Sequence, residues 1–151
     1  MNFVTSLEQY NDKFIFFCDP IKNNIMNDGS FIRILYSTPE MILNGIYLLI
    51  SINELTCDKY YNKFRCCFNP DTHRDLINKM KIIEETILEK INIKDKIPQF
   101  KIFEQLGNGN IKILNDVTQT NSSTFTFILK ISGIWETQQN YGLTYKFIKT
   151  T

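Results

Sequence analysis

Apolar runs in the first half of the chain predict β-strands. Short runs at residues 14–18 and 31–36, each closed by a turn that contains proline, are typical of buried strands. Residues 41–54 contain a third strand, apolar on both faces between residues 46 and 52, with Asn44-Gly45 as a turn or bulge. Residues 58–68 alternate between an apolar face and a basic, aromatic face, which predicts a fourth strand.

Residues 69–92 have the pattern of an amphipathic helix. Asn69 is suited to the N-cap and Pro70 to the first helical position. One apolar stripe follows at helical spacing, formed by Leu76, Met80, Ile83, Ile87 and Ile91. The opposite face is expected to be solvated, because it is made of charged residues: Lys79, Lys81, Glu84, Glu85, Glu89 and Lys90.

Further strands are predicted after Pro98, at residues 100–106, 111–114, 124–135 and 141–149. The sequence Gly-Asn-Gly-Asn at residues 107–110 is expected to join the first two as a hairpin turn. In the last two strands Lys130 and Lys146 are expected to face outward and to meet across the strands. Trp135 is either a core residue that closes one end of a barrel or a stacking surface. Gly133 and Gly142 indicate bulges or barrel corners.

The order of these elements predicts a mainly β fold with one helix, that is, a β-rich α+β fold. A helix between an early antiparallel meander and a late hairpin is the order of an OB-type barrel. We therefore expect one OB-like antiparallel barrel over residues 1–151, with one amphipathic helix after the early strands and a C-terminal β-hairpin. A general α+β sandwich is the alternative.

Composition and charge limit the function classes. With 17 basic and 16 acidic residues among 151, bulk positive charge cannot drive nucleic-acid binding, so any such site must be local. Residues 1–57 carry a net charge of −3 and residues 58–151 one of +4, which favours a site in the second part. The 53 Ile, Asn and Lys residues and the absence of alanine indicate an AT-rich genome, such as that of an insect virus, an endosymbiont or a parasite. The N-terminal residues lack a signal-peptide pattern and no apolar stretch is long enough for a bilayer, so an intracellular protein without a membrane partner is expected.

The cysteine and histidine positions do not point to a metal or catalytic site. In a reducing compartment Cys18, Cys57, Cys66 and Cys67 are expected to be free thiols. Their spacing to His73 lacks the paired C-x2-C knuckles of small zinc sites, and no third group is placed to orient a cysteine–histidine pair. His73 is expected at the surface. We expect no metal, no cofactor and no catalytic residue, and therefore no enzyme.

The outward face of residues 58–68 is the strongest candidate site. Lys59, Lys63 and Arg65 form a row of cations, with Tyr61 between them. Single-stranded nucleic acid needs this combination, because cations neutralise phosphates while aromatic rings stack on bases. A solvated strand face that happens to be basic is the alternative interpretation.

The C-terminal hairpin carries a resemblance to a known group of proteins. Residues 127–148 contain an apolar strand that ends in Gly-Ile-Trp, then a polar turn, then Tyr-Gly-Leu-Thr-Tyr-Lys-Phe. This pattern resembles the late strands of single-stranded-DNA-binding OB-fold proteins encoded by large DNA viruses, mobile elements and some phages. The resemblance implies a non-enzymatic protein that coats single strands during replication or recombination, with little sequence preference. Many viral proteins of this group end in an acidic tail, whereas this chain ends in Lys-Thr-Thr.

The leading hypothesis combines both surfaces. Phosphates are expected along Lys59, Lys63, Arg65, Lys130 and Lys146, and bases on Tyr61, Tyr141 and Trp135. DNA is favoured over RNA as the partner, although residue types alone do not separate the two, and self-association is left open. The rival is a β-rich protein-interaction module without nucleic-acid binding, because 20 aromatic residues are more than one barrel core readily buries.

Overall fold

The computed structural model describes residues 4–22, 29–60, 63–113 and 124–149. The strands in chain order are β1 (Ile15–Phe17), β2 (Ile21–Lys22), β3 (Ser30–Ser37), β4 (Ile42–Leu43), β5 (Ile46–Asn53), β6 (Thr56–Tyr60), β7 (Lys63–Cys67), β8 (Ile97–Gln99), β9 (Asn110–Ile113), β10 (Thr124–Glu136) and β11 (Asn140–Lys149). The helices are α1 (Arg74–Ile91) and α2 (Lys101–Gly107), with 3-10 turns at Asp12–Phe14 and Pro70–His73.

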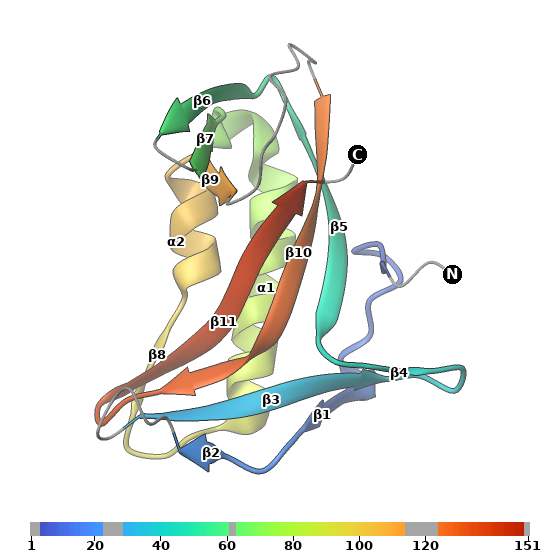
Figure 1. The fold of residues 1–151 in the computed structure, drawn as a ribbon, viewed down its shortest axis with the longest axis vertical. Coiled ribbons are helices and arrows are strands. Elements are labelled where there is room, and N and C mark those ends of the chain that lie inside the picture. Colours follow the sequence, from blue (N-terminus) through green and yellow to red (C-terminus); the bar gives the residue numbers. More distant parts are fainter. Residues whose placement is uncertain (1–3, 23–28, 61–62, 114–123, 150–151) are drawn as a thin grey trace.

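Strand β10 organises the larger sheet. One of its edges pairs antiparallel with β11, from Phe127 opposite Lys149 to Glu136 opposite Tyr141. Its other edge pairs first with β5 and then, beyond a register shift between Ile131 and Gly133, with β3. Strands β1, β2 and β4 add to β3, and β8 adds in parallel to the start of β11. The sheet curls as a result, with β3 crossing below β5, β10 and β11 (Figure 1).

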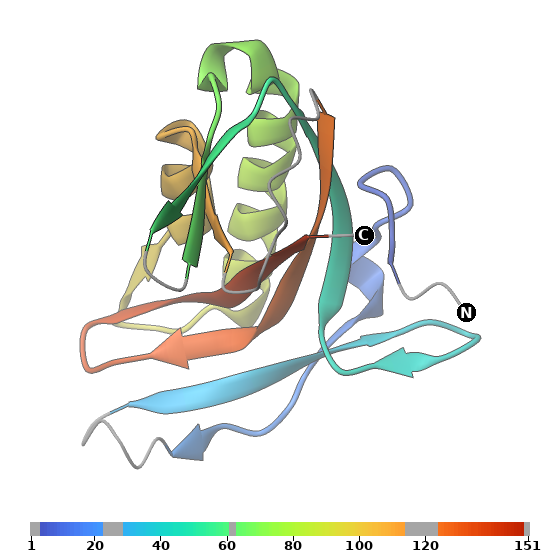
Figure 2. The same ribbon diagram turned by 45° about the horizontal axis from the view of Figure 1, so that its top comes forward.

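A second, three-stranded sheet has the order β6-β7-β9. It lies at one end of the molecule beside α2, while β10 and β11 bend around α1 (Figure 2). The main core lies between the curled sheet and α1, because alternate residues of β3, β5 and β10 are buried there together with Met80, Ile83 and Ile87 of α1. No helix within the described ranges is long and apolar enough to cross a membrane.

The helical segment that contains α1 begins at the residues that the sequence indicates. The Asn69 side chain accepts a hydrogen bond from the Asp71 amide at 3.0 Å, and Pro70 opens a 3-10 turn that leads into α1. Asn92 ends the helix with a left-handed backbone (φ +47°), and its amide bonds to the Leu88 carbonyl. The predicted end of the helix is confirmed, whereas its predicted first turn is a 3-10 turn and the α-helix itself begins at Arg74.

Two predicted strands are wrong. Residues 58–60 belong to β6 and residues 63–67 to β7, two antiparallel strands with Tyr60 opposite Lys63, so the predicted single strand is not formed. Residues 101–107 form the helix α2, because Ile102 and Leu106 lie one turn apart and both are buried. The turn at residues 107–110 therefore connects a helix to β9, and Gly109 adopts a φ of +72° in it.

Glu84 corrects the prediction of a fully solvated face on α1. Its carboxylate is completely buried and accepts hydrogen bonds from the amides of Ile102 (3.0 Å) and Phe103 (2.9 Å). These amides belong to the first turn of α2, where backbone donors have no partner within the helix. Glu84 thus fixes α2 against α1, while its burial raises its pKa.

The predicted fold class is confirmed: the protein has a mainly β, OB-like α+β fold. One long amphipathic helix follows the early strands, and a C-terminal β-hairpin closes a curled half-barrel. The helix α2 and the small sheet are additions to the predicted plan.

Candidate nucleic-acid interface

The larger sheet has an inner face against α1 and an outer face that neither of the described α-helices covers (Figure 1). Residues alternate between them, so that Ile32, Leu48 and Leu129 are buried inside while their neighbours project outward. The cross-strand registers align the outward residues into rows across β3, β5, β10 and β11. The central rows contain Leu49, Ile128 and Ile148, then Tyr47, Lys130 and Lys146, then Arg33, Gly133 and Thr144, then Phe31, Trp135 and Gly142.

Two aromatic rings lie against glycines on this outer face. A Cβ atom at Gly142 would stand 2.7 Å from Cζ2 of Trp135, and one at Gly133 would stand 2.5 Å from Cζ of Phe31. Both distances are far below an ordinary carbon contact of about 3.5–4.0 Å. The rings therefore occupy space that only glycine leaves free. Both aromatic side chains remain half-buried, so part of each ring faces solvent.

Cations lie beside these rings. Lys130 and Lys146 stand directly opposite each other, as the sequence predicted, although like charges in such a pair disfavour the folded sheet. The Lys130 Nζ atom lies 5.5 Å from the centre of the Tyr47 ring, within cation–π distance. Arg33 projects from β3 opposite Gly133 and is exposed.

No described residue that projects from the outer face of β3, β5, β10 or β11 is acidic. The one carboxylate on these strands, Glu136 at the end of β10, accepts hydrogen bonds from Lys96 and from Ser30. The bond from Lys96 is the main reason that the pKa of Glu136 is lowered. These four strands therefore supply no carboxylate that neutralises the cations of the outer face.

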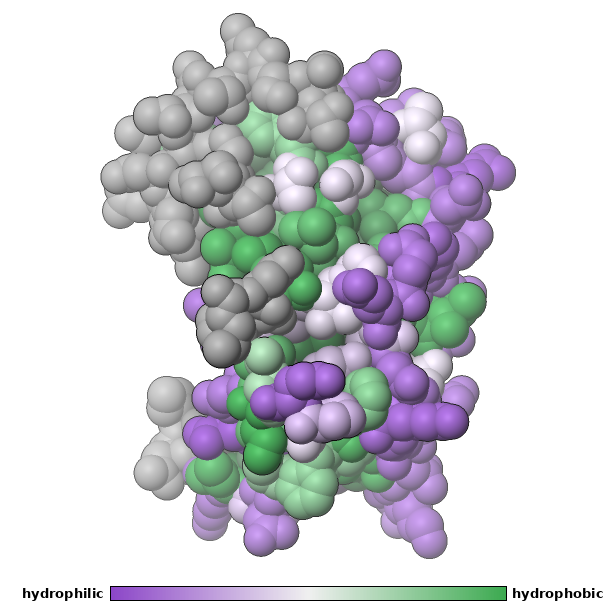
Figure 3. Space-filling model, turned by 90° about the vertical axis from the view of Figure 1, so that its right-hand side faces the viewer, coloured by the Kyte–Doolittle hydropathy of each residue, from purple (hydrophilic) through white to green (hydrophobic). Residues whose placement is uncertain are grey.

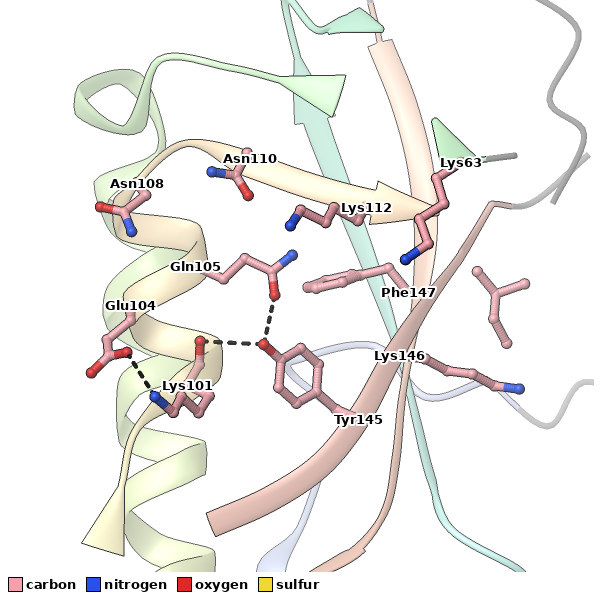
Figure 4. A pocket seen from close by; sticks show the side chains of 11 residues that line it. Lys63, Lys101, Glu104, Gln105, Asn108, Asn110, Lys112, Tyr145, Lys146 and Phe147 are labelled. Carbon is pink, nitrogen blue, oxygen red and sulfur yellow. Dashed lines mark hydrogen bonds and ion pairs between the residues drawn. The ribbon is translucent and has the colours of Figure 1, made fainter. Parts of the chain in front are cut away.

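A pocket of about 650 Å³ lies past the edge of β11, between this strand, α2 and the small sheet (Figure 4). Its lining is basic and polar: Lys63, Lys101, Glu104, Gln105, Asn108, Asn110, Lys112, Tyr145, Lys146, Phe147 and Ile148. Tyr145 donates a hydrogen bond to Oε1 of Gln105 at 2.5 Å, and the carbonyl oxygen of Lys101 is 3.3 Å from the same hydroxyl. Burial, together with the nearby carboxylates of Glu84 and Glu104, raises the pKa of Tyr145 to about 12. This hydroxyl therefore anchors β11 to α2 as a neutral group.

The structure divides the predicted site residues between these two places. Lys130 and Trp135 lie on the outer face, Lys63 lines the pocket, and Lys146 contributes to both. Tyr141, by contrast, is buried on the inner face and offers no ring surface to a base.

The residues of the β6–β7 pair do not form the single row that the sequence suggested. Arg65 is exposed, but its cross-strand neighbours are Asp58 and Lys112. Lys59 pairs through its backbone with Phe64, so it is out of register with Arg65, and its side chain lies outside the described part. Tyr61 also lies outside the described residues.

The cysteines differ from the prediction. Cys57 and Cys66 are cross-strand partners in β6–β7 and form a disulfide, so the expectation of four free thiols is wrong. Cys18 and Cys67 are free. Within the described ranges, no group of three His, Cys, Asp or Glu side chains is arranged to hold a metal ion.

His73 is buried, and its predicted surface position is wrong. The Asn53 amide donates to Nε2 at 3.0 Å, and Nδ1 lies 2.9 Å from the Asn69 carbonyl oxygen. With the proton placed on Nδ1, both ring nitrogens are occupied by backbone groups. The ring thus connects the start of the helical segment to the end of β5.

Sequence reasoning missed three residues of the outer face: Phe31, Arg33 and Tyr47. Each lies in a strand that was predicted, at an alternate position. The missing information was the pairing of β10 with both β3 and β5, which brings these residues beside Trp135 and Lys130.

No family model, curated protein or solved structure matches this chain.

Proposed function

We propose that this protein binds single-stranded nucleic acid, DNA in preference to RNA, on the outer face of β3, β5, β10 and β11, and that it catalyses no reaction. One observation carries the proposal. Phe31 and Trp135 lie on glycines beside Arg33, Lys130 and Lys146, on a face to which the described residues add no carboxylate. Aromatic rings supply stacking surfaces of about 1–3 kcal/mol per base, and the cations follow the phosphates.

The proposed biological role is to coat single strands during replication or recombination. It rests on the resemblance of the hairpin at residues 127–148 to viral and mobile-element proteins that do so. Stacking accepts any base, because every base has a π-face, so little sequence preference is expected. Lys63 and Arg65 are not part of this proposal, since they belong to the small sheet beyond β11.

The first test is fluorescence anisotropy with labelled oligo-dT over a range of salt concentrations. Affinity is expected to fall as salt rises, because each phosphate contact releases counterions. Lys130→Glu should weaken binding at least tenfold and reduce the salt slope by about 0.7 for the lost contact. Lys94→Glu makes the same charge change at an exposed lysine outside the outer face and should leave the affinity unchanged. Absence of binding at low salt would refute the proposal.

A second test addresses stacking. Trp135→Ala should reduce the affinity for oligo-dT by about tenfold, corresponding to 1.4 kcal/mol, whereas Trp135→Phe retains a ring and should lose less. Oligo-rU of equal length measures the preference for DNA. Equal affinities of the Ala and Phe variants would contradict a stacking role for this ring.

The exposed apolar residues support one other candidate function, a protein-interaction module. Phe16, Ile21, Ile42 and Leu49 are all at least two-fifths exposed. The side of the molecule that carries β5 and β4 shows hydrophobic surface between polar residues (Figure 3). Light scattering separates the candidates. The interaction module would be favoured by a stable oligomer that Leu49→Glu dissociates, together with an affinity for oligo-dT that Lys130→Glu leaves unchanged.

A further inference from the structure

Among the described residues, the edge of β11 that faces α2 has backbone hydrogen-bond partners over only a short part of its length. Strand β8 pairs with this edge only at Asn140, Tyr141 and Gly142. Between Leu143 and Ile148, β11 pairs with β10 on its other edge, and no described residue makes a backbone hydrogen bond to the edge that faces α2. These six residues span about 20 Å at a rise of 3.3 Å per residue. An open edge of this kind offers alternating N–H and C=O groups to an added strand.

The groove along this edge is strongly basic. Lys63 and Lys112 reach it from the small sheet, while Lys146 lines its border on β11 with a side chain that points away from them (Figure 4). None of these three forms an ion pair within the described ranges. The one carboxylate in the lining, Glu104, lies 3.7 Å from Lys101. The amide side chains of Asn108 and Asn110 complete a polar wall.

The edge and the charge select the same class of ligand. A second copy of this chain is disfavoured at the edge, because its lysines would meet those of the first copy. A phosphodiester satisfies the lysines but places its charge against the exposed carbonyl oxygens of the edge. An extended polypeptide pairs with both kinds of backbone group, and acidic side chains complement the lysines.

We propose that the groove between β11, α2 and β9 binds an extended acidic segment of a partner protein, which adds as a strand to β11 at Leu143–Ile148. This site lies on the other side of β11 from Lys130 and Trp135. Lys146 is shared with the outer face, so the test relies on Lys112, which lines the groove and does not belong to the outer face.

The test uses the whole protein and a labelled eight-residue peptide of alternating Glu and Val, measured by fluorescence anisotropy at low salt. Saturable binding is expected, and Lys112→Glu should weaken it at least tenfold. Lys94→Glu is the matched control and should leave it unchanged. A peptide with Lys in place of each Glu should not bind.

The backbone requirement is tested on the peptide, so that the protein fold is not disturbed. Replacing two Val residues by Pro removes amide donors, and binding should be lost although the charge is unchanged. Amide hydrogen exchange at Leu143–Ile148 should slow when the Glu-Val peptide is added.

Three results would overturn the proposal. The first is that the Glu-Val peptide does not bind, and the second is that the Pro-containing peptide binds equally well. The third is that oligo-dT displaces the peptide and that Lys112→Glu also loses affinity for oligo-dT. The last would make the groove a nucleic-acid site. A protein that binds the peptide but not oligo-dT would support this inference and refute the proposed function, so the two fail separately.

Discussion

Gly142→Ala is expected to move the Trp135 ring away from the sheet. The added Cβ atom would lie 2.7 Å from Cζ2 and 2.9 Å from Cε2 of the indole, and 3.0 Å from the carbonyl oxygen of Gln99. Because non-bonded carbon atoms prefer about 3.5–4.0 Å, the ring must shift by about 1 Å. The carbonyl belongs to the β8 backbone, so the ring has to give way first.

The cost follows from overpacking. Forcing extra atoms into a packed contact costs about 1–3 kcal/mol, while replacing glycine within a strand returns about 0.5–1 kcal/mol. The midpoints of these two ranges give a net loss of about 1 kcal/mol. For a chain of 151 residues this corresponds to a fall in Tm of roughly 2–4 °C.

Trp135 is the only tryptophan, so intrinsic fluorescence reports this ring alone. In Gly142→Ala the emission should shift to longer wavelength and acrylamide quenching should increase, because a displaced ring meets more water. Urea titration by the same signal gives the stability, and oligo-dT titration gives the effect on binding.

Gly107→Ala is the matched control. A Cβ atom at Gly107 would meet nothing within 4 Å, so the spectrum should be unchanged and the stability equal or slightly higher. If Gly142→Ala had the emission, quenching and Tm of the wild type, the ring would not depend on this glycine, and the stacking surface would lose its structural basis.

Three further outcomes are expected. Glu84→Gln should destabilise the protein by about 1–3 kcal/mol, because the amide supplies one acceptor where two backbone N–H groups need one each. Since burial raises the pKa of Glu84 above its unfolded value, the wild type should lose stability as pH rises from the unfolded to the folded pKa, and urea titrations from about pH 4 to 7 should show this loss reduced in the variant. Reduction of the Cys57–Cys66 disulfide should cost about 2.5 kcal/mol for a loop with a sequence separation of 9, measured by thermal unfolding with and without reductant. Lys146→Thr should raise stability by a few tenths of a kcal/mol by removing the repulsion with Lys130, yet weaken oligo-dT binding in the same preparation.

Local sequence patterns predicted the strands whose buried and outward residues alternate, and the helix whose first residues are suited to a helix start. The buried residues of β5 and of the first part of β10 recur at every second position, and Asn69-Pro70 starts the helical segment by its own chemistry. The helix α2 was not predicted because it is short and contains Ile102 and Phe103, residues of types that favour strands. What makes it helical is tertiary: buried Ile102 and Leu106, and the Glu84 carboxylate at its first turn.

The candidate site was predictable only in part for a related reason. Lys130 and Lys146 share a hairpin, so their register follows from the turn between them. Phe31 and Tyr47 come from strands whose distance in sequence from β10 exceeds 70 residues, and no local pattern specifies that pairing. That Gly142 leaves space for the Trp135 indole likewise cannot be predicted without knowing which residue lies opposite it.

The position of β10 in the chain has a consequence for folding. Strands β3 and β5 leave the ribosome long before Thr124–Glu136, yet β10 supplies the edge on which both complete their pairing. Until β10 is synthesised, these early strands have unpaired edges and exposed apolar residues, a state prone to association with other chains. Contacts of such high sequence separation also slow folding. Lys130 and Lys146 then lie opposite each other within the late β10–β11 pair, and their repulsion disfavours the pairing on which the sheet depends.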